Sequence, residues 1–296
     1  MAPANSGHSD FLTGEELSGR LGALLDRADE LKADRPAAGS GSLAGKSVAV
    51  IFEQPSTRTR VSFEVGIAEL GGTPVILQSD ELQIRRGESI GDIGRVMSRY
   101  VQAIAIRSLS HERVAELAAA ADVPVVNALT PEHHPCQAIA DLQTLRERFG
   151  RLEGLRVAFV GDGNNVARSL VLVGREAGVD VVVSSPPGFE LTDAPGARLV
   201  ADPREAVAGA HAVYTDVWFS MGESDAEAKR AALAPYRVDD ALVDLAADDA
   251  VVLHCLPAHP GEEITAEALY GPRSAVFDQA ENRLHAQKAL LEMLLA

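Results

Sequence analysis

The sequence predicts an α/β protein made of two domains, each built on a doubly wound parallel sheet. Apolar runs of strand length alternate with amphipathic segments of helical period, and this alternation occurs twice along the chain. The runs are continuously apolar, which is typical of parallel strands covered by helices on both faces. A length of 296 residues is enough for about two domains with separate cores.

The elements of the first domain occupy the N-terminal half of the chain. Its predicted strands cover residues 47–52, 73–77, 103–107 and 123–128. Its predicted helices cover residues 59–70, 89–101 and 111–121. Because these strands and helices alternate, we expect βα units and a parallel sheet.

A second series of elements begins after Gly150. Its predicted strands cover residues 156–162, 179–185, 211–216 and 250–256. A helix at about 137–149 is expected to join the two domains, whose junction lies near residues 135–155. The last segment, 278–296, has apolar residues at helical spacing and is expected to form a closing helix.

One crossover of the second domain is unusually short. Residues 186–198 hold three prolines and show no helical period, and they lead to a short apolar piece at 199–201. A parallel crossover normally needs a dozen or more residues, usually in a helix. We therefore expect this crossover to be compressed.

Composition and charge exclude several classes of function. The formal net charge of −16 argues against non-specific binding to nucleic acid, which demands a basic surface. No apolar stretch approaches the roughly 18 residues of a membrane span, and the N-terminus does not resemble a secretory signal. Two cysteines are too few for a disulfide scaffold. These features predict a cytoplasmic protein that binds neither membranes nor nucleic acid.

The strongest functional motif is a predicted strand-to-helix junction with the sequence FEQPSTRTR at residues 52–60. The first backbone N–H groups of a helix lack intrahelical partners, and the helix dipole favours an anion there. Ser56 can act as the N-cap, and Arg58 offers a bidentate guanidinium. Capping alone does not require two arginines and three hydroxyl groups at one helix start. The motif therefore predicts a phosphate site.

A glycine-rich turn, GDGNN at residues 161–165, follows the first strand of the second domain. It lacks two features of a dinucleotide-binding fingerprint, because Val166 stands at the third glycine and Ser184-Ser185 replace the acidic residue after the next strand. Two interpretations remain open. Either the turn is purely structural, or Asn165 presents its amide to a polar substrate.

Polar residues end several other predicted strands, where open α/β sheets bind their ligands. In the first domain Arg107 ends one strand, and His134 and Gln137 follow another; in the second domain Asp216 and Cys255 lie at strand ends. A carboxylate and a thiol at strand ends could receive a cationic amine. Cys255 as a nucleophile would need a nearby base, and neither cysteine has the paired partner of a metal site.

Six segments together resemble, in the same order, the signature segments of ornithine carbamoyltransferases. They are FEQPSTRTRVSFE, HPCQ, GDGNN, DVWFSMGE, HCLPAH and AENRLHAQK. The resemblance runs from about Lys46 to the C-terminus. STRTR and HP-x-Q are shared with aspartate carbamoyltransferases, whereas SMG after Asp216 and HCLP at 254–257 specify ornithine.

The resemblance implies an enzyme that carbamoylates the δ-amine of L-ornithine, giving citrulline and phosphate without metal or cofactor. It implies a carbamoyl phosphate domain at 1–145, an ornithine domain at 146–277 and a C-terminal helix, 278–296, that returns to the first domain. It also implies homotrimers, or multiples of trimers, with active sites shared between subunits.

Residues at matching positions take their expected roles from the same resemblance. Those implied to bind carbamoyl phosphate are Ser56, Thr57, Arg58, Thr59, Gln83 from a neighbouring subunit, Arg107, His134, Gln137, Cys255, Leu256 and Arg283. Those implied to bind ornithine are Asn165, Asp216, Ser220 and Met221. Those implied to be catalytic are Arg107, His134, Asp216 and Cys255.

Two departures from the family and three alternatives qualify this prediction. Pro260 replaces an arginine of the usual HCLPAHRGEE, and the segment 186–198 is shorter than usual.

A carbamoyltransferase for aspartate, putrescine or an N-acylated ornithine is disfavoured by SMG at 220–222. A catalytically silent paralogue predicts damage at Arg58, His134 or Arg283, and all three are intact. A nucleotide-dependent oxidoreductase is disfavoured by the incomplete fingerprint.

Overall fold

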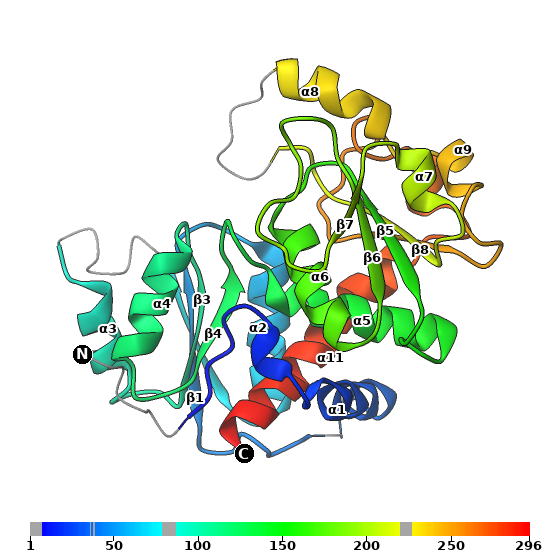
Figure 1. The fold of residues 1–296 in the computed structure, drawn as a ribbon. Helices are drawn as coiled ribbons and strands as arrows, with labels where there is room; N and C mark the ends of the chain where they lie inside the picture. The colour runs from blue at the N-terminus through cyan, green and yellow to red at the C-terminus, as the bar shows by residue number, and fades with distance from the viewer. Residues whose placement is uncertain (1–7, 36, 38, 79–86, 220–226) are drawn as a thin grey trace. The chain divides into compact units, whose positions relative to one another are not determined.

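The chain folds into two compact units in a computed structural model that describes residues 8–35, 37, 39–78, 87–219 and 227–296. The first unit comprises Met1–Ile139 and Asn282–Ala296, and the second comprises Ala140–Glu281. Figure 1 shows a separate sheet in each unit. Among the described residues, no helix combines the length and the apolar character that crossing a bilayer requires.

The first unit is built on a four-stranded parallel sheet in the order β2-β1-β3-β4. Its strands are β1 (Ser47–Phe52), β2 (Thr73–Gln78), β3 (Ala103–Arg107) and β4 (Val125–Leu129). The central strands β1 and β3 are almost completely buried, as their continuous apolar sequences require. Phe52 pairs with Arg107, so β1 and β3 end at the same edge of the sheet.

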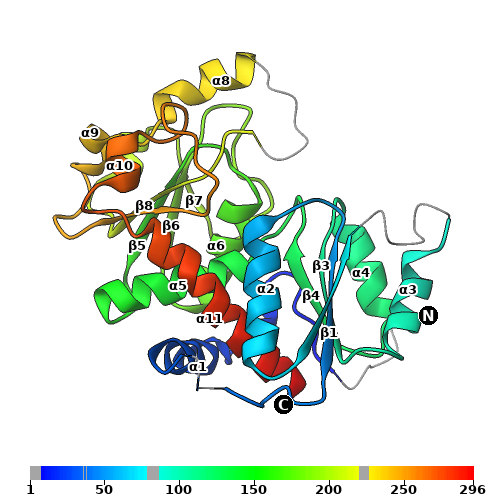
Figure 2. The same ribbon diagram turned by 180° about the vertical axis from the view of Figure 1, so that it is seen from behind.

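Helices cover both faces of this sheet. Figure 2 shows α2 (Thr57–Glu69) and the C-terminal part of α11 (Val276–Leu295) on one side, and α3 (Ile90–Met97) and α4 (His111–Ala120) on the other. Apolar residues of α3 and α4 share one core cluster with the strands. The first unit also contains η1 (Glu15–Leu17) and α1 (Leu21–Ala33), which the sequence analysis did not anticipate.

A buried ion pair and two partly exposed ones link α11 and its neighbours within the first unit. The fully buried Lys288 donates from Nζ to Oε2 of Glu69 at 2.9 Å, and Arg35 donates from Nε to Oε1 of the same carboxylate at 2.8 Å. Arg27 of α1 donates to Glu292 at 2.5 Å. The C-terminal helix therefore packs on the first domain, as expected.

Loss of the Lys288 ammonium should destabilise the first unit. Burial raises the pKa of the Glu69 carboxyl, but hydrogen bonds from Lys288 and Arg35 outweigh it and hold that pKa below its usual value. We expect Lys288→Ala to lower the free energy of unfolding by about 3 kcal/mol at pH 7, because it removes one partner of a buried pair. Urea unfolding measures this difference.

The effect of Lys288→Ala should also depend on pH. A depressed folded-state pKa contributes stability above the unfolded pKa of about 4.3 and loses it as the pH falls through the folded value. The difference between Lys288→Ala and the native protein should therefore shrink below about pH 4. Arg35→Ala is the control, with an expected loss under about 1 kcal/mol because this guanidinium is partly exposed. Equal losses in the two variants would contradict the assignment.

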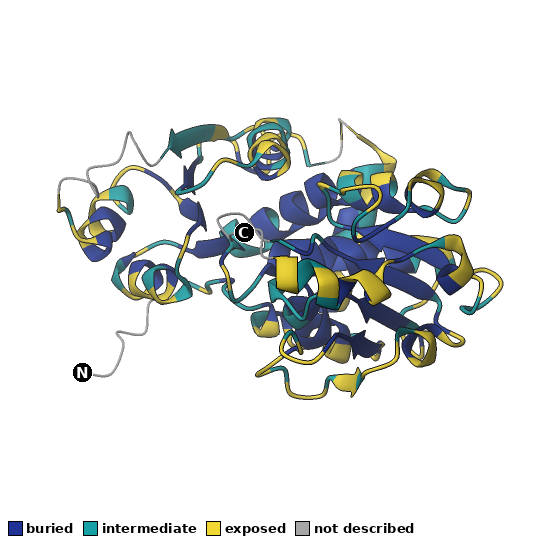
Figure 3. Ribbon diagram, turned by 90° about the horizontal axis from the view of Figure 1, so that it is seen from above, coloured by how far each residue is buried: buried dark blue, intermediate teal, exposed yellow. Residues whose placement is uncertain are grey.

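The second unit is built on a five-stranded parallel sheet in the order β7-β6-β5-β8-β9. Its strands are β5 (Arg156–Val160), β6 (Asp180–Ser184), β7 (Arg198–Val200), β8 (Ala212–Thr215) and β9 (Val251–His254). Four of these strands, β5, β6, β8 and β9, are mostly buried, whereas the short β7 is mostly exposed. Figure 3 colours the ribbon by burial. This order is doubly wound, which confirms the predicted fold class.

The helices of the second unit are mostly short. They are α5 (Pro135–Phe149, which begins in the first unit), α6 (Asn165–Glu176), α7 (Pro203–Val207), α8 (Glu227–Leu233), η3 (Ala234–Tyr236), α9 (Asp240–Val243) and α10 (Ala266–Tyr270). Residues of α7, α9 and α10 form one core cluster with the central strands. The α5 helix lies within residues 135–155, the region predicted to hold the junction, and it covers the helix expected at about 137–149.

The compressed crossover leads from β6 to β7 without a helix. Three hydrogen bonds hold it in place: Gly163 N–H donates to the Phe189 carbonyl at 2.9 Å, Arg168 donates to the Thr192 carbonyl at 3.0 Å, and Arg175 donates to the Pro195 carbonyl at 3.3 Å. The segment thus lies against the α6 helix and the turn before it. The strand it reaches, β7, is only three residues long.

Candidate active site

In the first unit, polar residues gather where β1, β3 and β4 end. Arg107 is the last residue of β3, and α2 begins a few residues after β1. His134 lies after β4 and directly before α5. These carboxyl ends share one edge of a parallel sheet, which is where α/β proteins bind ligands.

The start of α2 differs from the starts of six other helices in the described part of the chain. Ser56 is its N-cap residue, but the Ser56 side chain makes no capping hydrogen bond. Side-chain oxygens cap α3, α4, α6, α7, α9 and α10, from Ser89, Ser110, Asn164, Asp202, Asp239 and Thr265. Arg58 is exposed in the first turn of α2, beside the positive end of the helix dipole. This arrangement suits an anion.

Arg283 connects three helices of the first unit. Its buried guanidinium donates to Gln137 Oε1 at 2.8 Å, to Thr59 Oγ1 at 3.4 Å and to Gln287 Oε1 at 3.0 Å. Thr59 lies on α2, Gln137 on α5, and Arg283 with Gln287 on α11. The structure therefore brings together three residues that the sequence analysis selected from segments far apart in the chain.

His134 is buried among positive charges. Burial lowers the pKa of its imidazole well below 6.5, and the charges of Arg283, Arg107 and Arg58 lower it further. The ring is therefore neutral at neutral pH. A neutral imidazole beside arginines fits a hydrogen bond to a substrate's polar atom, because it adds no further charge to the group.

Cys136, two residues away, has a structural role. Burial raises the pKa of its thiol to about 12 although Arg283 opposes the change, and the thiol donates to the Asn127 carbonyl at 3.4 Å. A thiol with so high a pKa is inert as a nucleophile at neutral pH.

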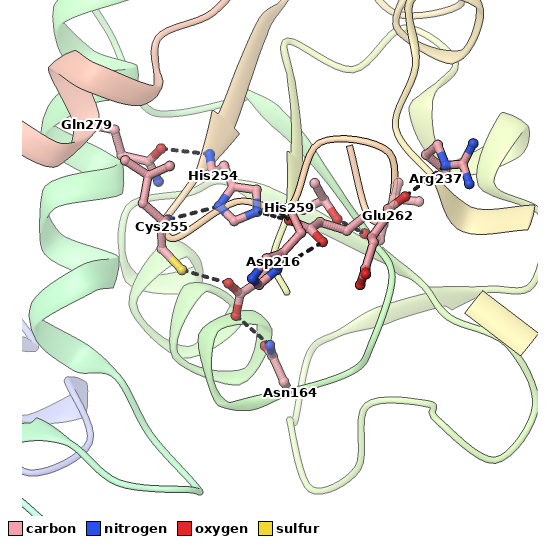
Figure 4. A network of polar contacts seen from close by, with 12 residues as sticks. Asn164, Asp216, Arg237, His254, Cys255, His259, Glu262 and Gln279 are labelled. Atoms are coloured by element: carbon pink, nitrogen blue, oxygen red, sulfur yellow. Dashed lines mark hydrogen bonds and ion pairs between the residues drawn. The ribbon is translucent and has the colours of Figure 1, made fainter. Parts of the chain in front are cut away.

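In the second unit, Asp216 and Cys255 lie in contact at the ends of β8 and β9. Thr215 pairs with His254, so the residues that follow them are neighbours. The Cys255 thiol donates to Asp216 Oδ1 at 2.9 Å, and the Asn164 amide donates to Asp216 Oδ2 at 2.7 Å (Figure 4). Each oxygen of this buried carboxylate thus has its own donor.

A buried histidine supports the loop that carries Cys255. His254 Nδ1 accepts the Leu256 N–H at 2.9 Å, so its proton lies on Nε2, which is 3.2 Å from Glu263 Oε1. Burial raises the pKa of Glu263, but hydrogen bonds from His254 and the His259 backbone outweigh it and hold that pKa below its usual value. Leu256 has a left-handed φ of 58°, a conformation that non-glycine residues adopt at a cost. The His254 contact stabilises it.

Two hydrogen bonds hold the loop that contains Pro260. Glu263 accepts the His259 N–H at 2.5 Å, and Arg237 donates to the Glu262 carbonyl at 2.8 Å (Figure 4). Pro260 itself is exposed. The turn therefore keeps contacts on both sides of the position where the family usually has an arginine.

The space beside Gly163 in the GDGNN turn is occupied by other residues of the same unit. A Cβ atom at Gly163 would lie 2.2 Å from the Leu191 backbone nitrogen, so the short crossover passes directly over this glycine. In dinucleotide-binding domains the second glycine of the turn lets the backbone approach a pyrophosphate. Here residues 189–191 take that space, which gives a physical reason for rejecting the dinucleotide interpretation.

Donor atoms for a metal ion occur near the same loop. Atoms of Asp216, His254 and Cys255 lie within 4.8 Å of one another, as do atoms of His259, Glu262 and Glu263. Both ring nitrogens of His254 already make hydrogen bonds, so a metal at the first group would have to replace one of them.

The structure covers most of the predicted site residues. Gln83, Ser220 and Met221 lie outside the described residues. Asn165 begins α6 and Leu256 follows Cys255. Sequence reasoning missed Asn164, although an asparagine directly before a helical pattern is an N-cap signal that could have identified it. It also missed Glu263, for which the sequence carries no local signal.

Comparisons with known proteins agree with this arrangement. Residues 9–147 match the carbamoyl-P binding domain of aspartate/ornithine carbamoyltransferases, and residues 153–294 match their Asp/Orn binding domain. The chain is 56% identical to an ornithine carbamoyltransferase of Acidothermus cellulolyticus over 96% of each sequence. It is 50% identical to that of Bacillus subtilis over 97% of this chain and 93% of the relative.

A solved structure of similar sequence has the same fold. The ornithine carbamoyltransferase of Pyrococcus furiosus has a TM-score of 0.92 and 45% identity, with 97% of each chain covered. Family models therefore match nearly the whole chain, in the order of its two units. The chain belongs to the aspartate/ornithine carbamoyltransferase family.

Proposed function

We propose that this protein transfers the carbamoyl group of carbamoyl phosphate to the δ-amine of L-ornithine, forming citrulline and phosphate. Relatives about half identical over nearly their whole length carry the name ornithine carbamoyltransferase. The observation that carries the proposal is the 2.9 Å contact between Cys255 and Asp216, because it joins the two segments specific to the ornithine branch. A buried carboxylate held by neutral donors suits a cationic amino group.

In this proposal, residues 1–145 bind carbamoyl phosphate. The start of α2, with Ser56, Thr57, Arg58 and Thr59, holds the phosphate, and Gln83 of a neighbouring subunit completes the cradle. Arg107, the neutral His134 and Gln137 bind the carbamoyl oxygen and amide. Arg283, brought back by residues 278–296, reaches the same group. The contacts of Arg283 with Thr59 and Gln137 support this assignment.

Residues 146–277 bind ornithine through Asn165, Asp216, Ser220 and Met221, with Cys255 and Leu256 beside the reacting amine. The lone pair of the deprotonated δ-amine attacks the carbamoyl carbon. The C–O bond to phosphate then breaks, phosphate leaves with the electron pair, and the second proton of the amine nitrogen passes to the departing phosphate. Donors to the developing oxyanion, from Arg107, His134 and Thr59, contribute about 3–4 kcal/mol each in comparable sites.

Citrulline formation by the purified protein tests the proposal. Carbamoyl phosphate is supplied with ornithine, and in parallel with aspartate, putrescine or N-acetylornithine. The proposal requires citrulline as the main product and ornithine as the preferred acceptor. Faster turnover of another acceptor would place the protein in a different branch of the family, and no turnover with any acceptor would favour a silent paralogue.

Assembly is the second part of the proposal: the enzyme is a cytoplasmic homotrimer or a multiple of one. If each site needs Gln83 from a neighbour, a Gln83→Ala variant and an Arg58→Ala variant are each inactive but carry different defects. Mixing them under conditions that exchange subunits should restore part of the activity, because some sites then combine two intact contributions. A fully active monomer in light scattering, or no recovery on mixing despite exchange, would contradict the shared site.

A further inference from the structure

The side-chain amide of Asn164 makes hydrogen bonds of two kinds. Its Oδ1 accepts the N–H groups of Val166 at 3.0 Å and Ala167 at 3.2 Å, which caps α6. Its Nδ2 donates to Asp216 Oδ2 at 2.7 Å (Figure 4). The residue therefore ties the first turn of α6 to the carboxylate at the end of β8.

The cap fixes which end of the amide faces Asp216. Backbone N–H groups need an acceptor, so the carbonyl oxygen must point at the helix and the NH₂ group must point at the carboxylate. Cys255 holds the other carboxylate oxygen at 2.9 Å. With one donor on each oxygen, the carboxylate plane of Asp216 has a single orientation.

The turn before Asn164 is itself braced. The Asn164 N–H donates to the Asp162 carbonyl at 2.8 Å. The Asp162 carboxylate accepts from Lys229 Nζ at 2.9 Å, and both side chains are less than 15% exposed. Lys229 also lies 5.4 Å from the centre of the Phe189 ring. Little solvent reaches this ion pair, so it restrains the turn more firmly than an exposed pair would.

We infer that Asn164 is a positioning residue for the amine acceptor: it uses the N-cap of α6 to orient Asp216 toward the substrate amine. The inference rests on the proposed function, in which Asp216 receives the ornithine amine. A carboxylate that rotates freely would spend part of its time with its lone pairs directed away from the amine. The Asn164 contact removes that freedom before ornithine binds.

Two substitutions keep the cap and remove the amide donor. Serine and aspartate are N-caps as good as asparagine, so Asn164→Ser should unfold at nearly the native temperature, and Asn164→Asp should do so at a pH at which the two carboxyl groups share a proton. Loss of a hydrogen bond to a charged group should lower kcat/KM for ornithine about 10- to 100-fold. The KM for carbamoyl phosphate should change by less than about twofold, because the contact lies wholly in the second unit.

The activity of the Asn164→Asp variant with ornithine should depend on pH in a characteristic way. Its new carboxylate repels Asp216 when both are ionised, and the pair holds one proton more readily than a single carboxylate would. Once protonated, the new side chain can donate to Asp216 as the amide does. The ratio of variant to native kcat/KM for ornithine should therefore rise as the pH falls from about 8 to about 6. A merely structural residue gives no such recovery.

Asp239→Ala is the matched control, because it removes the N-cap of α9 in the same unit without touching Asp216. It should lower the unfolding temperature and leave the ornithine KM unchanged. The inference is overturned if native protein makes citrulline while both Asn164 variants keep native kcat/KM for ornithine. It is also overturned if they lose efficiency toward both substrates equally, in step with stability. A native protein that makes no citrulline would instead refute the proposed function.

Discussion

Replacing Arg58 with alanine is expected to remove nearly all turnover at limiting carbamoyl phosphate while the fold stays intact. Arg58 is exposed in the first turn of α2, next to an N-cap serine whose side chain makes no capping bond. Its guanidinium is therefore available for a bidentate contact with phosphate and contributes little to the core. Loss of one such donor typically lowers the rate about 10²- to 10³-fold, and kcat/KM for carbamoyl phosphate measures it.

Arg60 provides the control within the same helix. It is also exposed, and it is paired with Glu64 at 3.3 Å across one turn of α2. An exposed pair of this kind contributes under about 0.5 kcal/mol. Arg60→Ala should therefore leave stability nearly unchanged and lower kcat/KM far less than Arg58→Ala does. Near-native affinity for carbamoyl phosphate in Arg58→Ala, or equal losses in the two variants, would refute the phosphate site at this helix.

The sequence predicts the fold well for strands that are buried on both faces, because such a strand forms an almost continuous apolar run. Strands β1, β3, β5 and β9 are covered on both faces, so their continuous apolar runs identify them and their ends to within about two residues. The α1 helix was not anticipated, although Leu21, Leu24, Leu25, Ala28 and Leu31 follow a helical period. The short helices α7, α9 and α10 carry too few residues for a periodic signal.

The site was predictable in its types of residue but not in its contacts. Arginine, histidine, aspartate and cysteine at strand ends indicate the edge at which α/β proteins bind their ligands. The partner of Asp216 is set by where α6 begins, because a shift of one residue decides which asparagine caps the helix. The buried Glu263 beside His254 depends on a loop that returns to the strand end. Such contacts arise from tertiary structure and leave no pattern in the sequence.

The largest effect on the acceptor side is expected for Asp216→Asn. Asp216 is the charged group assigned to the ornithine amine, and its two oxygens are oriented by Asn164 and Cys255. The amide would lose the charge and place an NH₂ group against one of those donors. We expect kcat/KM for ornithine to fall about 10²- to 10³-fold, comparable with removal of a charged catalytic contact. Cys255→Ser should show a smaller loss of the same kind.

The turnover of the native enzyme at limiting ornithine should depend on pH. An ornithine δ-amine titrates near the pKa of lysine, about 10.4, so nearly all of it is protonated at pH 7. Turnover at limiting ornithine should therefore rise between about pH 7 and 9, as the reactive neutral amine becomes more abundant. Because burial and three arginines hold the pKa of His134 well below 6.5, its ionisation does not contribute to this rise.

The division of labour between the units decides how the acceptor variants should behave. Asp216 and Cys255 belong to the second unit, whereas Arg58, His134 and Arg283 belong to the first. Asp216→Asn should therefore retain native affinity for carbamoyl phosphate, and Cys255→Ser should lose much less affinity for carbamoyl phosphate than for ornithine. Fluorescence of Trp218, the single tryptophan and two residues from Asp216, offers an independent measure of ornithine binding. If both variants lost carbamoyl phosphate affinity and kept ornithine affinity, the assignment of one substrate to each unit would be wrong.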